Sequence, residues 1–146
     1  CPFKGKLAML VLVFSLLVPA SAACAAEAPR DGVFIHISHG PEDPHRVLMA
    51  LSMASRMAAD HDVLVYFDIK GIEVVLAGAP DIAYAQFPAA KAQLAALLAQ
   101  KIKIMACPGC LQAAGKTPAD LAPGIAVADK ESFFSFTQGR ILTLDY

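Results

Sequence analysis

The side chains best suited to chemistry in this sequence are the two thiols of the turn Cys107-Pro108-Gly109-Cys110. The turn follows residues 101–106, which we predict to be the third strand, and precedes a short helical stretch at 111–114. A helix N-terminus supplies free N–H groups and partial positive charge, which stabilise a thiolate and lower the pKa of a thiol. We therefore predict that Cys107 is the attacking nucleophile and Cys110 the resolving thiol. Cysteines this close together close too small a loop to stabilise a fold much, and such pairs more often serve redox or metal chemistry.

Histidines that follow the first predicted strand are the next candidates. His39 lies in the polar segment 38–44, directly after the apolar run 33–37, and His45 comes just after that segment. Either imidazole could move a proton for Cys107 or bind a metal beside the cysteines. The predicted catalytic residues are therefore Cys107, Cys110 and His39. For a soft metal ion such as zinc or copper(I), the candidate ligands are Cys107, Cys110, His39 and His45. Apart from such a metal ion, no cofactor is predicted.

The two remaining histidines are not predicted to take part. His36 lies inside the apolar run 33–37, where a histidine is more often a core residue whose hydrogen bonds are satisfied. His61 is expected at the surface, at the end of a helix.

An alternation of strands and helices has to position these groups. Helices are expected between apolar strands at 33–37, 63–67, 101–106, 125–127 and 140–144. Continuous apolar strands that alternate with helices predict an α/β fold: a flavodoxin-like three-layer sandwich with a mostly parallel five-stranded sheet in the order 2-1-3-4-5. Ligands bind such sheets beyond the carboxyl ends of the strands, where the strand order reverses. The loops of His39 and Cys107 should then be neighbours, with these residues within roughly 10 Å of each other.

The first 25 residues are typical of a secretory signal peptide. Two lysines precede an apolar run from Leu7 to Val13, and small residues follow from Ala20 to Ala26. We expect cleavage near residue 25, a mature domain over residues 30–146, and a periplasmic or secreted protein. A lipoprotein modified at Cys24 is the less favoured alternative. Residue 1 is Cys rather than Met, so the sequence does not identify the true N-terminus.

Charge excludes one class of partner. Beyond residue 25 the chain has 10 basic and 13 acidic residues, a net charge of −3, and no basic run. Binding to a nucleic acid backbone needs clustered lysines and arginines, so no nucleic acid partner is expected. The mature chain also contains no apolar run long enough to span a membrane.

The sequence resembles the DsrE/DsrF-like family over residues 32–146. The resemblance is carried by the strand that leads into Ser38-His39-Gly40-Pro41, the strand end Tyr66-Phe67-Asp68, the run from Lys103 to Cys107, and the final Leu142-Thr143-Leu144. Members of the DsrE and TusD type carry sulfur as a cysteine persulfide in relays and assemble as multimers. The resemblance implies that Cys107 is the sulfur-accepting cysteine and that the protein is a homo-oligomer.

We expect an exported DsrE-like thiol protein that accepts, carries or transfers sulfane sulfur on Cys107, with Cys110 releasing it by forming a disulfide. Its partners would be a sulfur donor or acceptor protein, or a small thiol. Two alternatives stay open: a binding module for zinc or copper, and a thioredoxin-type dithiol oxidoreductase. The sequence does not decide whether the protein turns over as an enzyme, nor does it identify the sulfur donor and acceptor.

Overall fold

The fold was obtained as a computed structural model that describes residues 27–146. The predicted signal peptide and Cys24 lie outside the described residues. None of the helices between residues 27 and 146 is long and apolar enough to cross a membrane.

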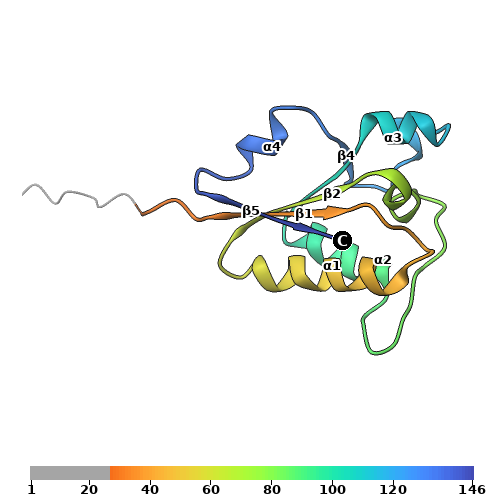
Figure 1. Cartoon of the computed structure of the whole chain (residues 1–146), viewed down its shortest axis with the longest axis horizontal. Helices are drawn as coiled ribbons and strands as arrows, with labels where there is room; N and C mark the ends of the chain where they lie inside the picture. Colours follow the sequence, from red (N-terminus) through yellow and green to blue (C-terminus); the bar gives the residue numbers. More distant parts are fainter. Residues whose placement is uncertain (1–26) are drawn as a thin grey trace, which may run out of the picture.

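One parallel sheet of five strands forms the centre of the protein (Figure 1). Its strands are β1 (Gly32–Ile37), β2 (Asp62–Phe67), β3 (Lys103–Ala106), β4 (Ala126–Val127) and β5 (Ile141–Asp145). The helical elements are α1 (Pro44–Met57), η1 (Ile69–Val74), α2 (Ala90–Ala99), α3 (Pro108–Ala113), η2 (Pro118–Asp120) and α4 (Ser132–Ser135). The predicted fold class, an α/β fold with a parallel five-stranded sheet and helices on both faces, is confirmed.

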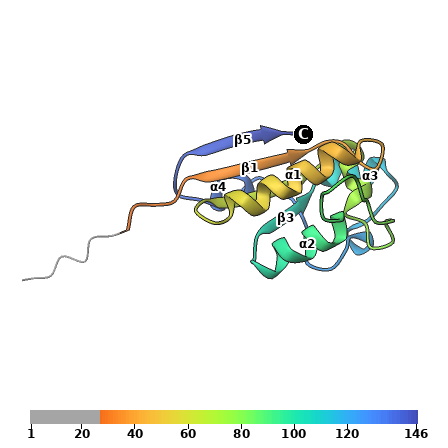
Figure 2. The same ribbon diagram turned by 90° about the horizontal axis from the view of Figure 1, so that it is seen from below.

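The strands follow the order β4-β3-β2-β1-β5. The pairs β1–β2 and β3–β4 agree with the expected order 2-1-3-4-5, but β2 rather than β1 lies beside β3, and β5 pairs with β1. The reason is the direction of winding. Successive right-handed crossovers from β1 to β2 to β3 run in one direction and place α1 and α2 side by side on one face of the sheet, as Figure 2 shows.

The alternation of side chains assigns the central strands to two cores. In β1, Val33, Ile35 and Ile37 are buried on the α1 face, in the main core. The residues between them point to the α4 face, where a smaller cluster contains Phe34, Leu64, Tyr66, Met105, Ala128, Phe133 and Phe136. Figure 1 shows α1 and α2 on one side of the sheet and α4 on the other. Because these helices cover the two faces of the sheet, the loops at the carboxyl ends of the strands can form a site.

Local sequence signals place the loops at this carboxyl edge. The carboxylate of Asp43 accepts the backbone N–H of Arg46 and so caps α1, with Pro44 at the first helical position. η1 follows β2 directly and passes against the end of β1. At Gly71 a Cβ atom would overlap the carbonyl oxygen of Ile37, so only glycine allows this close approach.

Candidate thiol site

Cys107 stands where β3 ends and α3 begins. Its backbone N–H donates to the carbonyl of Phe67 at 2.8 Å, which extends the pairing of β3 with β2 by one residue. Its side chain is the N-cap of α3 and accepts the backbone N–H of Cys110, with 3.4 Å between nitrogen and sulfur. Pro108 occupies the first helical position, which requires no N–H donor. Both cysteines are free thiols and half-buried.

The surroundings of Cys107 favour its thiolate. Burial acts to raise the pKa of the thiol, but hydrogen bonds from the hydroxyl of Tyr66, from Cys110 and from the backbone of Gly109 outweigh it and hold the pKa below its ordinary value. Cys107 therefore has the larger share of reactive thiolate at neutral pH, as the sequence predicts for the attacking sulfur.

Tyr66 is the donor that reaches Cys107 from the neighbouring strand. It pairs with Met105 across the β2–β3 ladder, and its ring packs edge-on against Phe133 of α4, with centroids 5.1 Å apart. Burial and the bond to Cys107 raise the pKa of Tyr66, so the phenol stays protonated and donates.

Cys110 has the opposite character. The backbone N–H of Ile69 donates to its sulfur, which acts to lower the pKa, but burial and the negative charges of Cys107 and Asp68 raise the pKa above its usual value. Ile69 holds this N–H in place with a φ of 46°, in the left-handed region that β-branched residues rarely adopt. At neutral pH Cys110 is thus a thiol that must lose a proton before it can attack.

An imidazole between two carboxylates completes the site. In His36, Nδ1 lies 2.7 Å from Oδ1 of Asp145 in β5, and Nε2 lies 2.9 Å from Oδ1 of Asp68, the residue that follows β2. Neither His36 Nε2 nor Asp68 Oδ1 has another hydrogen-bond partner in the described part of the chain. Burial acts to lower the pKa of His36, but the bonds to Asp145 and Asp68 raise it overall.

Strand register brings these residues together. His36 is aligned with Tyr66 on one side and with Asp145 on the other, and the rings of His36 and Tyr66 lie 5.8 Å apart. The interpretation of His36 as a core histidine is therefore incomplete, because its ring is bonded at the carboxyl edge beside the thiol site. The sequence signal for this was the position of His36 near the end of a strand, but its partners became visible only with the strand pairing.

Comparison with known proteins assigns the chain to a family. The model of the DsrE/DsrF-like family matches residues 31–139. The chain belongs to this family. No curated protein is significantly similar to it in sequence. Among solved structures, MTH1491 from Methanobacterium thermoautotrophicum, described as a protein of unknown function, is 19% identical with a TM-score of 0.59, and the match covers 79% of this chain and 99% of that one. YchN from E. coli is 13% identical with a TM-score of 0.53, and the match covers 79% of this chain and 98% of YchN. At these identities the two structures show a shared fold alone.

The histidines predicted for the site of this DsrE-like domain lie in other surroundings. Nδ1 of His39 is 3.3 Å from the hydroxyl of Ser38, and the carboxylate of Glu42 in the same loop accepts the N–H of Gly40. The expected proximity of His39 to Cys107 relied on adjacent β1 and β3, but β2 lies between these strands. A role of His39 toward Cys107 stays a prediction.

His45, the other candidate metal ligand, lies against aromatic rings. The ring of His45 stacks on Tyr84 at 5.0 Å and lies 5.5 Å from Phe87, at the start of α1. Within residues 27–146, no group of three or more His, Cys, Asp or Glu side chains is arranged to hold a metal ion. The geometry therefore gives no support to a soft-metal site built from Cys107, Cys110 and these histidines.

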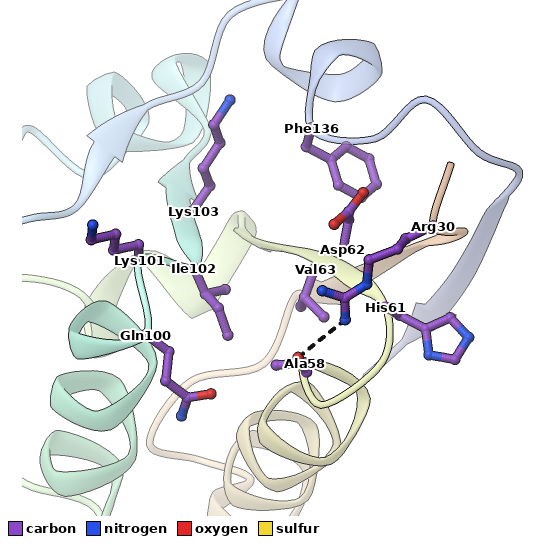
Figure 3. A pocket seen from close by; sticks show the side chains of 10 residues that line it. All are labelled: Arg30, Ala58, His61, Asp62, Val63, Gln100, Lys101, Ile102, Lys103 and Phe136. Carbon is purple, nitrogen blue, oxygen red and sulfur yellow. Dashed lines mark hydrogen bonds between the residues drawn. The ribbon is translucent and has the colours of Figure 1, made fainter. Parts of the chain in front are cut away.

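A cavity of about 230 Å³ lies at the opposite edge of the sheet in this DsrE-like domain, at the amino ends of β2 and β3. Its lining includes the basic residues Arg30, Lys101 and Lys103. Figure 3 shows that these side chains diverge: the guanidinium of Arg30 points to the carbonyl of Ala58, and both lysines point away from it. Charges that do not converge make a poor anion site, so the carboxyl edge with its two thiols is the better candidate.

Proposed function

We propose that this exported DsrE-like protein carries sulfane sulfur as a persulfide on Cys107 and that Cys110 releases it. The observation that carries the proposal is the pairing of two unlike thiols: Cys107 has a lowered pKa and Cys110 a raised one, three residues apart at the carboxyl edge of the sheet. Cys107 is the sulfur that more readily forms the attacking thiolate, and Cys110 keeps its proton more firmly. Membership of a family that is generally related to sulfur relay supports the same chemistry.

The loading step needs only the Cys107 thiolate and a donor of sulfane sulfur, either inorganic polysulfide or the persulfide of a partner protein. The thiolate attacks the donor's terminal sulfur, a sulfur–sulfur bond forms, and the donor's own sulfur–sulfur bond breaks. The rest of the donor leaves with the electron pair as a thiolate or a shorter polysulfide. The hydroxyl of Tyr66, which donates to Cys107, and the N–H of Cys110 are placed to stabilise negative charge at this position.

Location and assembly are part of the proposal. The pattern of residues 1–25 supports export to the periplasm or beyond, where disulfides persist and a Cys107–Cys110 bond could form. Exposed apolar side chains support a homo-oligomer or a partner protein: Ile141 and Leu142 of the edge strand β5 are 43% and 55% exposed, and Phe134 of α4 is 68% exposed.

Loading with inorganic polysulfide tests the proposal. In the variant Cys110→Ser the persulfide cannot be released internally, so intact mass spectrometry should show a gain of about 32 Da, one sulfur atom, on the folded protein. The matched variant Cys107→Ser, which keeps Cys110, should gain nothing. Equal gains in both variants, or none in either, would contradict a carrier role for Cys107. A dithiol oxidoreductase would instead pass directly between dithiol and disulfide without a sulfur-bearing species.

A further inference from the structure

Release of sulfur by Cys110 requires a base. If Cys107 carries a persulfide, Cys110 must attack the inner sulfur as a thiolate, because the thiol is a poor nucleophile. Before loading, the pKa of Cys110 already lies above its ordinary value because of burial and of the negative charges of Cys107 and Asp68. A nearby group that takes the proton at the moment of attack would remove this barrier.

Asp68 is the carboxylate placed for this task. It is next in the chain to Ile69, whose backbone N–H donates to the Cys110 sulfur, and its negative charge acts on both Cys110 and Tyr66. Its side chain is only 18% exposed, and it follows Phe67, whose carbonyl oxygen accepts the backbone N–H of Cys107 at 2.8 Å. The position of Asp68 is fixed from behind by His36, whose Nε2 lies 2.9 Å from Oδ1.

Both nitrogens of the His36 ring contact carboxylates. His36 is held between Asp68 and Asp145, and these carboxylates together favour its protonated form. Asp145 is 71% exposed and contacts the other ring nitrogen, Nδ1. Of the two carboxylates, Asp68 is the one whose charge acts on Cys110.

We propose that Asp68 accepts the proton of the Cys110 thiol as that sulfur attacks the persulfide of Cys107, with His36 holding the carboxylate in position; this inference rests on the proposed function. In the step, a bond forms between the sulfurs of Cys110 and Cys107, and the bond from Cys107 to the outer sulfur breaks. The outer sulfur leaves with the electron pair as hydrosulfide. The two cysteine sulfurs are oxidised to a disulfide and the outer sulfur is reduced to sulfide, so no other oxidant or reductant is needed.

The test separates loading from release. The mature protein, in which Cys107 and Cys110 are the two cysteines, is mixed with limiting inorganic polysulfide, quenched at intervals with acid, and weighed intact, so that the persulfide and the disulfide are followed separately. In Asp68→Asn the persulfide should form at the wild-type rate, whereas its conversion to the disulfide should slow by about a hundredfold, the usual range for loss of a general base. The matched control is Asp62→Asn, at the other end of the same strand, which should release sulfur at the wild-type rate.

Chemical rescue distinguishes a proton acceptor from a structural residue. In Asp68→Ala, added formate should restore a large part of the release rate, because a small carboxylate can occupy the vacated space. Slow release that formate does not restore, or release at the wild-type rate in both variants, would overturn the inference. If circular dichroism shows that Asp68→Asn and Asp68→Ala do not fold, Asp68→Ser, which has no carboxylate, replaces them: slowed release that formate restores supports the inference, and wild-type release contradicts it.

The two proposals fail in different ways. No persulfide on any variant, the wild type included, contradicts the proposed function and removes the inference with it. A persulfide that forms and discharges normally in Asp68→Asn contradicts the inference alone.

Discussion

At the scale of single residues, the reactivity of Cys107 depends on hydrogen bonds that come from two sides. The backbone N–H groups of the α3 turn come from the local sequence, and the phenol of Tyr66 comes from the neighbouring strand β2. A hydrogen bond to a charged group contributes about 1.5–3 kcal/mol, so the loss of one donor should alter the thiolate measurably. We therefore expect Tyr66 to act on the thiol as well as to belong to the aromatic cluster beneath α4.

Replacing Tyr66 with phenylalanine should slow the alkylation of Cys107. Tyr66→Phe removes the hydroxyl that lowers the pKa of Cys107, so the pKa rises and less thiolate is present at neutral pH. We expect iodoacetamide to modify Cys107 about tenfold more slowly, which corresponds to about one pKa unit. The rate can be followed by mass spectrometry of the peptide. Tyr84→Phe, on an exposed loop beside His45, is the control and should react like the wild type. An unchanged rate in Tyr66→Phe would show that the phenol does not stabilise the thiolate.

The cysteines could be predicted from the sequence and their partners could not. A Pro-Gly pair between two cysteines after an apolar run is a local signal, so the placement of Cys107 at the start of a helix followed from neighbouring residues alone. The roles of Tyr66, Asp68 and His36 depend on which strands pair and in which register, and these residues are distant from Cys107 in the chain. His39 was a candidate because its loop follows β1, but β2, not β1, lies next to β3.

At the scale of elements, the turn after β2 positions two of the residues that we propose for sulfur release, Asp68 and Ile69. Asp68 is still extended, Ile69 turns into the left-handed region with a φ of 46°, and η1 then passes against the carbonyl of Ile37 at Gly71. The existence of strands and helices could be predicted from apolar periodicity. This turn could not, because isoleucine gives no sequence signal for a left-handed conformation.

The close approach at Gly71 predicts a large difference between two glycine substitutions. In Gly71→Ala the new Cβ would overlap the carbonyl oxygen of Ile37. This oxygen belongs to the backbone of β1 and cannot move aside as the end of a flexible side chain could, so we expect a loss of about 1–3 kcal/mol of unfolding free energy. In Gly78→Ala nothing lies within 4 Å of the new Cβ, and the loss should be close to zero. Urea unfolding of the two variants measures the difference. Equal stabilities would mean that η1 does not press on β1.

At the scale of the whole molecule, one histidine ties three strands together. His36 of β1 is bonded to Asp145 on the edge strand β5 and to Asp68 after β2. The same imidazole therefore links the thiol site to the edge strand by two ion pairs. The strand order explains why this was not foreseen: in 2-1-3-4-5 the fifth strand lies far from the first, whereas in the observed order β5 pairs with β1.

These ion pairs predict a pH-dependent stability. The folded protein raises the pKa of His36 above its unfolded value of about 6.5. A raised pKa contributes stability that is complete below the unfolded pKa and is lost as the pH rises through the folded pKa. The difference in unfolding free energy between the wild type and His36→Gln should therefore be larger at about pH 6 than at about pH 9. His61→Gln, at the surface after α1, controls for general effects of losing an imidazole. A difference that is the same at both pH values, or that grows with pH, would contradict the arrangement of charges around His36.

The central claim concerns which sulfur receives the sulfane sulfur, and a time course on the wild-type protein tests it most directly. After mixing with limiting polysulfide, samples are alkylated at short intervals, digested, and fragmented by mass spectrometry so that each cysteine of the α3 turn is weighed separately. We expect the added sulfur to be found first on Cys107, while Cys110 is still a plain thiol, and to disappear as the Cys107–Cys110 disulfide forms. Sulfur found first on Cys110, or a disulfide that forms with no sulfur-bearing species before it, would contradict the account.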